Sequence, residues 1–156
     1  MSPKTIIFSL IGFFILLSGL IFLFSPRKKL EADRPKAETP LTFFNLGEMR
    51  VSDVKQQNFN LTNAGTKPLK ILNINSSCDC TFGQIIYKDL TSQEYGMHTQ
   101  SGYVTEIAPG DTATIRVTYK PAIMPVYGLV TREVYLTTND PVKPKLIFSV
   151  KAMVKQ

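Results

Sequence analysis

The sequence holds few of the side chains on which most enzymes depend, with two cysteines and one histidine among 156 residues. Two cysteines are too few for a disulfide framework. Any Ser-His-Asp triad would have to use the single histidine, and the chain has no G-x-S-x-G motif. We therefore predict that the protein is not an enzyme and has no small-molecule substrate.

A nucleic-acid recognition motif is also missing, although the formal net charge is +6. Half of this excess lies in residues 1–40, which hold six Lys or Arg against three Asp or Glu. A membrane surface explains basic residues that lie beside an apolar segment. The other half is spread along residues 41–156 without clustering. We predict no nucleic-acid partner.

An uncharged apolar run of nineteen residues covers Ile6–Phe24. A helix of this length, at ~1.5 Å per residue, is about 28 Å long and crosses a hydrocarbon core of ~30 Å. No A-x-A-like cleavage pattern follows the run, as it would in a signal peptide. We predict a short tail at 1–5, an uncleaved transmembrane anchor at 6–24 and a flexible linker at 25–40.

Two later segments alternate apolar and polar residues with the period of half-buried antiparallel strands, Thr112–Tyr119 and Lys145–Lys155. Strands at short spacing, without helices between them, indicate a sandwich or a barrel. We predict an all-β fold, an immunoglobulin-like antiparallel β-sandwich over residues 41–156, preceded by one transmembrane helix. The residues expected in its core are Ala113, Ile115, Val117, Tyr119, Leu146, Phe148, Val150, Ala152 and Val154.

Weaker strand patterns and one long polar segment complete the predicted domain. Residues 81–106 begin with a short strand candidate, F-G-Q-I-I-Y-K, and continue as a polar, glycine-interrupted loop. Loops of this length are usually functional or disordered. The weaker strand candidates are 43–46, 51–62, 69–74 and 130–137.

Four fragments stand in order along this domain: F-N-L-T-N-A-G-T-K-P-L-K-I at Phe59–Ile71, S-C-D-C-T at Ser77–Thr81, I-A-P-G at Ile107–Gly110 and T-N-D-P at Thr138–Pro141. Taken together, they resemble a bacterial family of Ig-like domains of unknown function. That family is characterised by an S-C-G-C-T motif and is related to Hydin-type and major-sperm-protein-like domains. The resemblance implies an Ig-like fold and export from the cytoplasm, and it implies no activity.

The sequence departs from the family pattern at two places. Asp79 stands where the family usually has glycine, which argues against a glycine-dependent tight turn at this position. About twenty residues are inserted between Thr81 and Ile107, which suggests a local specialisation.

The basic residues beside the apolar run and the family resemblance imply opposite orientations of the domain across the membrane. Arg27, Lys28 and Lys29 follow the apolar run and only Lys4 precedes it, so the positive-inside rule alone keeps the domain in the cytoplasm. The resemblance implies an exported domain instead. We predict a single-pass protein of the bacterial cytoplasmic membrane with its C-terminal domain outside the cytoplasm, and a cytoplasmic domain is the alternative.

Cys78 and Cys80 are the first candidates for chemistry. On an extended strand, residues two apart face the same side with Cα atoms about 6.5–7 Å apart, at the upper limit for a disulfide. Two thiolates on one face suit a soft metal, and a disulfide in so small a ring is labile. A structural role, a metal site and a redox role all remain open.

Met97 and His98 lie together in the long loop, and His98 is the only histidine. With Cys78 and Cys80 they offer sulfur and imidazole ligands that suit Cu(I) or Zn²⁺. The alternative is an exposed histidine beside a methionine that covers the sandwich. The candidate metal residues are therefore Cys78, Cys80, Met97 and His98.

Aromatic and apolar residues outside the strands are candidates for binding a partner, because tyrosine and methionine are enriched at protein interfaces. The segment from Lys120 to Tyr127 is apolar with two prolines, and it is either a rigid crossing loop or a partner site. The candidate partner-binding residues are Tyr95, Tyr103, Met124 and Tyr127.

These patterns lead to one main interpretation and one alternative. The main one is a membrane-tethered, non-enzymatic Ig-like interaction module of the bacterial cell envelope, attached through residues 6–24 and bound to another envelope protein. The alternative is a metal-handling protein that binds copper or zinc. No cofactor is required by the main interpretation.

Overall fold

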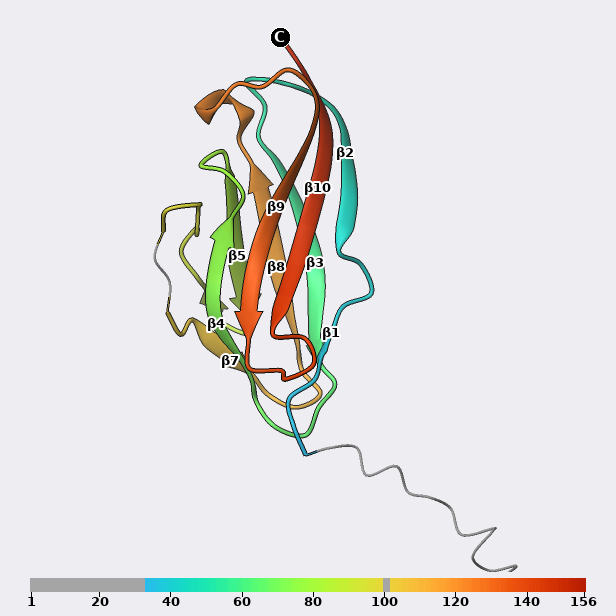
Figure 1. The fold of residues 1–156 in the computed structure, drawn as a ribbon, viewed down its shortest axis with the longest axis vertical. Coiled ribbons are helices and arrows are strands. Elements are labelled where there is room, and N and C mark those ends of the chain that lie inside the picture. The colour runs from blue at the N-terminus through green and yellow to red at the C-terminus, as the bar shows by residue number, and fades with distance from the viewer. Residues whose placement is uncertain (1–32, 100–101) are drawn as a thin grey trace, which may run out of the picture. The chain divides into compact units, whose positions relative to one another are not determined.

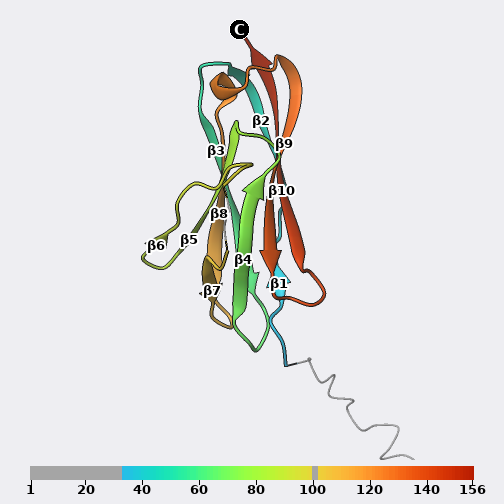
Figure 2. The ribbon, with the colours of Figure 1, turned by 60° about the vertical axis from the view of Figure 1, so that its left-hand side comes forward.

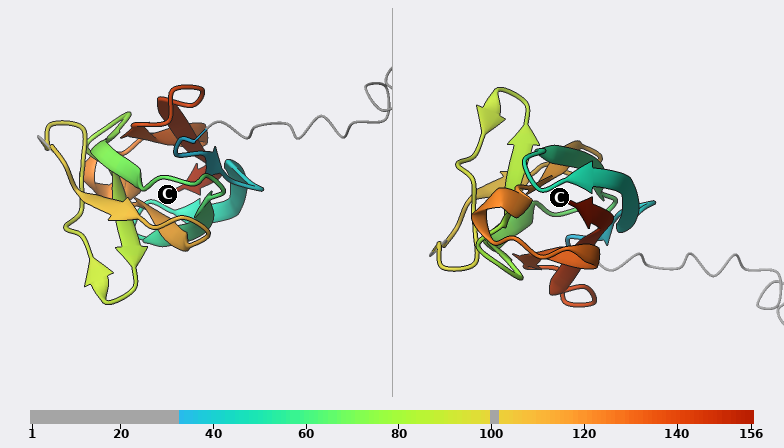
Figure 3. Two further views of the ribbon diagram at one scale, coloured as in Figure 1. Left: turned by 90° about the horizontal axis from the view of Figure 1, so that it is seen from below. Right: turned by 90° about the horizontal axis from the view of Figure 1, so that it is seen from above.

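The computed structural model describes residues 33–99 and 102–156, which fold into two β-sheets that face each other (Figure 1; Figure 3). The all-β prediction is confirmed for this part of the chain, where the one helical element is the 3₁₀ turn η1, Pro121–Ile123. The first sheet has the order β1 (Ala37–Glu38), β3 (Lys55–Asn63), β8 (Thr112–Tyr119), β5 (Thr81–Tyr87) and β6 (Leu90–Thr91). The second has the order β2 (Phe43–Arg50), β10 (Lys145–Lys155), β9 (Gly128–Thr138), β4 (Leu69–Ser76) and β7 (Thr105–Ile107).

The predicted membrane anchor at 6–24 and the tail at 1–5 lie outside the described residues. Across the described ranges, no helix is long and apolar enough to cross a membrane.

The folded unit extends from Asp33 to Gln156, so it includes the last part of the predicted linker, 25–40. Ala37 and Glu38 form β1 because they pair antiparallel with the end of β3.

The core lies between the two sheets and confirms the alternation predicted for β8 and β10. All nine residues expected in the core are buried. Phe59 of β3 and Phe148 of β10 meet across the sandwich, with ring centroids 5.2 Å apart. Aromatic pairs at this separation contribute about 1 kcal/mol beyond the area they bury.

The pairing of β2 with β10 is parallel, so the prediction of a wholly antiparallel sandwich is wrong at this strand. The chain crosses from the first sheet at β1 to the second at β2, and it therefore enters β2 in the same direction as β10. Gly47, with a φ of +71°, lies opposite Ala152, where the register shifts between Lys151 and Ala152. Glycine adopts this left-handed backbone without strain.

The outer edge of β2 is occupied by a lysine from the other sheet. β2 has β10 as its one hydrogen-bonded neighbour, and it is the edge of its sheet. The Nζ atom of Lys55, in β3, donates to the carbonyl oxygens of Leu46 at 2.7 Å and Glu48 at 2.8 Å. Lysine at a sheet edge is a common means of preventing strand addition.

The long segment predicted at 81–106 covers the outer edge of β5. Tyr95 and Gly83 exchange two backbone hydrogen bonds of 2.9 Å each, and Ser92 N–H donates to the Ile85 carbonyl at 3.0 Å. The remaining strands of the segment, β6 and β7, have two and three residues. The segment therefore covers the edge of the first sheet while forming few strand-pairing hydrogen bonds of its own.

Two motifs of the family-like pattern hold the N-terminal segment in place. Asn63, which is fully buried, donates to the carbonyl oxygens of Lys67 at 2.8 Å and Ile107 at 2.9 Å. Its Oδ1 atom accepts from the backbone of Lys36 and Gly65. The N-x-G part of the motif is thus structural.

The buried carboxylate of Asp140 completes this attachment. It accepts hydrogen bonds from the backbone of Ala37 at 2.8 Å and Val142 at 2.9 Å, and from Arg34 Nη1 at 2.8 Å. Burial raises the pKa of Asp140, but the N–H donors of Ala37, Val142 and Lys143 and the Arg34 charge outweigh it, so this pKa lies below 3.8. The T-N-D-P motif is therefore a structural lock.

The two ends of the sandwich differ in what they carry (Figure 1; Figure 2). β1 and the β3–β4 and β9–β10 turns lie at one end, which we call the N-terminal pole. Asp33 belongs to this pole because it contacts Thr66 and Lys67 of the β3–β4 turn. The β2–β3 turn, η1 and the end of β10 lie at the other, which we call the distal pole.

Candidate functional site

Cys78 and Cys80 lie in the turn between β4 and β5, not on an extended strand. The Thr81 N–H donates to the Cys78 carbonyl at 3.2 Å, which closes the turn. The Cα atoms of the two cysteines are 5.3 Å apart and their sulfurs form a disulfide. The extended geometry predicted from the sequence is wrong here, because the turn brings the two residues well within disulfide reach.

Hydrogen bonds hold the backbone of this disulfide turn on both sides. Ser76 Oγ donates to the Cys78 carbonyl at 2.7 Å. The Lys120 N–H, at the end of β8, donates to the Cys80 carbonyl at 2.8 Å. The shape of the turn is therefore fixed by contacts other than the S–S bond.

Arg132 of β9 reaches the disulfide from the second sheet. Its Nε donates to the Sγ atom of Cys80 at 3.3 Å, and its guanidinium carbon lies 5.7 Å from the centroid of the Tyr119 ring. The two cysteine residues differ in exposure, since Cys80 is 0% exposed and Cys78 is 9% exposed. Thr81 Oγ1 lies 3.3 Å from the Cys78 sulfur.

The hydroxyl of Tyr119 is buried in the small apolar cluster that contains both cysteines. Within the described part of the chain it has no hydrogen-bond partner. Burial raises the pKa of Tyr119, and the charge of Arg132 and the approach of its guanidinium N–H groups oppose part of this rise, although no N–H of Arg132 has hydrogen-bond geometry toward the hydroxyl. An unsatisfied buried hydroxyl costs free energy of folding.

The loop with Met97 and His98 approaches the disulfide turn through one contact. His98 Nε2 lies 3.5 Å from an oxygen of Asp79, the residue between the two cysteines. Met97 is exposed. Among residues 33–99 and 102–156, no three His, Cys, Asp or Glu side chains are grouped so that they could hold a metal ion. The copper or zinc site at Cys78, Cys80, Met97 and His98 stays a prediction.

The four candidate partner-binding residues do not lie on one surface. Tyr95 is 8% exposed and belongs to the main core, so its ring forms no part of an exposed patch. Tyr103 is exposed just before β7, toward the N-terminal pole. Met124 and Tyr127 are exposed at the distal pole, in the loop between β8 and β9.

The structure adds four apolar residues to Met124 and Tyr127. Ile123 and Val126 belong to the same loop, and Leu129 of β9 lies directly opposite Met153 of β10. The sequence signal for Met153 was weak, since it is one apolar residue on the mostly polar outer face of β10. We define the distal apolar surface as the exposed side chains Ile123, Met124, Val126, Tyr127, Leu129 and Met153.

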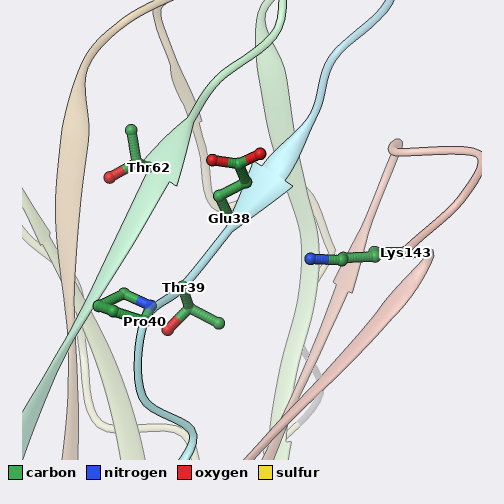
Figure 4. Close-up of a pocket in the computed structure, with 5 residues that line it drawn as sticks. All are labelled: Glu38, Thr39, Pro40, Thr62 and Lys143. Atoms are coloured by element: carbon green, nitrogen blue, oxygen red, sulfur yellow. The ribbon is translucent and has the colours of Figure 1, made fainter.

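A shallow pocket of about 440 Å³ lies toward the N-terminal pole, between β1 and the β9–β10 turn (Figure 4). Glu38 in its wall pairs with Lys36 at 2.7 Å. The hydrogen bond and charge of Lys36, with a smaller effect of Lys143, lower the pKa of Glu38. The lining of the pocket is about half polar and half apolar, and it brings together no nucleophile and base. It is lined by Glu38, Thr39, Pro40, Thr62 and Lys143.

With this geometry established, comparison with known proteins identifies the family. Residues 38–154 match the family described as "Protein of unknown function (DUF1573)". The chain belongs to this family. The resemblance to a domain family of unknown function is thereby confirmed, while the S-C-G-C-T motif and the relation to Hydin-type and major-sperm-protein-like domains stay predictions. No curated protein sequence matches the chain.

Solved structures share the fold of this DUF1573 domain at low sequence identity. A protein of unknown function from Porphyromonas gingivalis W83 is 19% identical with a TM-score of 0.60, over 82% of this chain and 51% of its own. The ASH/PapD-like domain 7 of human CEP192 is 13% identical with a TM-score of 0.51, over 84% of this chain and 92% of its own. A family 123 glycoside hydrolase from Clostridium perfringens is 11% identical with a TM-score of 0.52, over 73% of this chain and 23% of the hydrolase.

These likenesses concern the fold alone. This chain spans about half the length of the Porphyromonas gingivalis protein and about a quarter of the hydrolase. The match to a separate ASH/PapD-like domain supports an Ig-like fold for this chain.

Proposed function

We propose that this DUF1573 protein is a membrane-tethered, non-enzymatic Ig-like interaction module of the bacterial cell envelope. The observation that carries the proposal is the distal apolar surface, which lies at the opposite end of the sandwich from Asp33. A tether that joins the domain at Asp33 leaves this surface free to meet another protein.

The sheet edges argue for docking through side chains and against strand addition. Strand addition needs a long free edge, as in peptide recognition by β-augmentation. Lys55 occupies two carbonyls of β2, and the other edge strands, β1, β6 and β7, have three residues or fewer. The exposed apolar side chains are therefore the better means of binding.

Charged residues near the distal apolar surface are paired within the domain. Lys155 bonds Glu48 at 2.7 Å and Lys120 bonds Glu94 at 2.7 Å, while Arg50 lies 3.8 Å from Asp53. An apolar centre with a polar rim is typical of a protein interface. The partner that fits is a folded envelope protein with an apolar patch of its own.

The disulfide supports a domain outside the cytoplasm, because disulfides persist in oxidising compartments and are rare in the bacterial cytosol. This agrees with the family resemblance and opposes the positive-inside count at Arg27, Lys28 and Lys29. A reporter fused after Gln156 that is active only outside the cytoplasm is the expected result. Activity of a cytoplasm-only reporter there would contradict the proposed topology.

Site-specific photocrosslinking in the native membrane tests the interaction module. A photoreactive phenylalanine at Tyr127 is expected to give one discrete crosslinked product. The same photoreactive residue at Val142, which is apolar and even more exposed than Tyr127 but lies in the β9–β10 turn at the N-terminal pole, is the control and should give none.

A charge within the surface should remove this product. Leu129→Lys is expected to reduce it at least tenfold, and Val142→Lys should leave it unchanged. Equal crosslinking from positions 127 and 142, or a product that survives Leu129→Lys, would contradict the proposal.

A metal-handling protein remains the second candidate, favoured by the contact of His98 with Asp79 between the two cysteines. Metal binding would need the reduced thiolates. The full chain, reduced and purified in detergent without chelator, is expected under this alternative to take up about one equivalent of copper or zinc. Uptake that is unchanged by Cys78→Ser with Cys80→Ser would exclude the proposed ligands.

A further inference from the structure

The two cysteines of the disulfide differ in exposure. Cys80 is fully buried, whereas part of the Cys78 residue reaches the surface. An incoming thiolate therefore approaches from the side of Cys78, and Cys80 becomes the leaving group. The turn thus determines which cysteine is attacked and which one leaves in an exchange reaction.

Arg132 stabilises the thiolate that such an attack releases. Its Nε already donates to Cys80 Sγ at 3.3 Å in the disulfide form. A positive guanidinium beside a sulfur lowers the pKa of the thiol, and a thiol of lower pKa leaves faster. Arg132 is 52 residues away from Cys80 in sequence and on the opposite sheet, so the fold itself creates this contact.

Hydrogen bonds hold the backbone of the disulfide turn in addition to the S–S bond. The carbonyls of Cys78 and Cys80 are held by Ser76, Thr81 and Lys120. The bridge joins residues only two positions apart, so it restricts the unfolded chain little and contributes little loop entropy. Reduction can therefore open the bond and leave the turn in place for reoxidation.

We propose that Cys78 and Cys80 form a reversible thiol–disulfide exchange site whose substrate is a dithiol, with Arg132 as the residue that holds the leaving Cys80 thiolate. This activity goes beyond the interaction module and does not require the distal apolar surface.

The reaction proceeds in two displacements. One thiolate of the dithiol attacks Cys78 Sγ, a mixed disulfide forms, and the electron pair of the broken Cys78–Cys80 bond remains on Cys80 Sγ. The second thiolate of the dithiol then attacks the substrate sulfur of the mixed disulfide. The bond between that sulfur and Cys78 breaks, and Cys78 leaves as a thiolate. The dithiol becomes a disulfide and loses two electrons and two protons. The cysteine pair gains both electrons, and the protons go to Cys78, Cys80 or solvent.

Equilibration of the full chain, in detergent and with a chelator, against reduced and oxidised dithiothreitol measures the exchange. Free thiols are blocked with iodoacetamide and counted by mass spectrometry, while far-UV circular dichroism follows the sheets. We expect complete reduction with an unchanged β-sheet signal. Reduction that occurs only together with loss of that signal would overturn the proposal.

The rate of disulfide reduction in Arg132 variants distinguishes an exchange site from a disulfide with only a structural role. Arg132→Met is expected to slow reduction about tenfold, and Arg132→Lys, which keeps the charge, should fall between it and the parent chain. Arg116→Met is the matched control, because Arg116 donates to Asn58 in an exposed contact on the other sheet. Equal rates for Arg132→Met and Arg116→Met would overturn the role of Arg132.

Single cysteine variants test the direction of attack. In Cys80→Ser the remaining Cys78 is expected to form a mixed disulfide with oxidised glutathione at least tenfold faster than Cys80 does in Cys78→Ser. Equal rates, or faster reaction of Cys80, would overturn the assignment of Cys78 as the attacked sulfur.

Discussion

Arg34 donates a hydrogen bond of 2.8 Å to Asp140, although 106 residues separate them in sequence. This contact fastens the N-terminal segment to the turn between β9 and β10. The same carboxylate accepts the N–H of Ala37, the first residue of β1. One buried side chain thus holds the segment that leads into the sandwich.

Removal of this carboxylate should destabilise the domain strongly. Asp140→Ala leaves the Ala37 and Val142 N–H groups and the Arg34 charge without their acceptor, and we expect a loss of about 3 kcal/mol in the free energy of unfolding. Glu48→Ala removes an exposed ion pair with Lys155 and should cost less than about 1 kcal/mol. Urea denaturation followed by circular dichroism measures both. Equal losses would show that Asp140 is not a lock.

The same carboxylate gives the stability an acid dependence. Because the pKa of Asp140 is lower in the folded state than its usual 3.8, its contribution is fully present above about pH 4–5. The contribution is lost as the pH falls through the lowered value. Between pH 5 and pH 2 the parent chain should therefore lose more stability than Asp140→Asn does. Parallel curves for the two proteins would contradict the assigned pKa direction.

Gly65 has no room for a side chain. A Cβ atom there would overlap the Arg34 carbonyl oxygen and lie 2.6 Å from the Lys36 nitrogen, both of which are backbone atoms. We expect Gly65→Ala to cost about 2 kcal/mol in unfolding free energy. Gly102→Ala is the control, since a Cβ at Gly102 meets nothing within 4 Å. Thermal unfolding of the two variants under the same conditions gives the comparison.

Loss of the Lys55 ammonium should expose the edge of β2. Lys55→Met keeps the length of the side chain but leaves the Leu46 and Glu48 carbonyls without their donor. We expect concentration-dependent association, detected by light scattering, together with a loss of about 1–2 kcal/mol in unfolding free energy. Lys155→Met, which breaks only an exposed ion pair, should remain monodisperse over the same range. Association of both variants alike would point to net charge as the cause.

Tyr119→Phe should preserve or increase stability. It removes a buried hydroxyl that has no partner in the described part of the chain, and we expect a gain of up to about 1 kcal/mol in unfolding free energy. A loss above about 1 kcal/mol, measured by urea denaturation, would show that the hydroxyl is satisfied in solution.

Strong local patterns made part of the fold predictable. β8 and β10 alternate cleanly because each has one face in the core and one in water, and their register was correct. The first half of β2 was expected as a weak strand at 43–46 and its second half was missed, because β2 is a bulged edge strand whose one buried residue is Met49. The parallel pairing of β2 with β10 follows from the crossover after β1, and the residues of β2 give no indication of that crossover.

The candidate site was predicted only in part for a similar reason. The pairing of Cys78 with Cys80 depends on a turn that the S-C-D-C-T letters do not specify, since extended residues at this spacing were an equally valid interpretation. The Arg132 contact joins two sheets and has no local pattern. The distal apolar surface was visible in the segment after Lys120, but Leu129 and Met153 join it only through strand pairing.

The parallel alignment of β2 and β10 also determines how the domain bears mechanical load. Tension between a tether at Asp33 and a partner held at the distal pole pulls the start of β2 against the end of β10. The force then runs along both strands, so their hydrogen bonds are loaded in shear and must break together. β1 has only two residue pairs with β3 and yields first, together with the Asp140 lock. With the proposed tether and partner in place, we expect the domain to release a short length of chain under tension while its core and its disulfide turn stay folded.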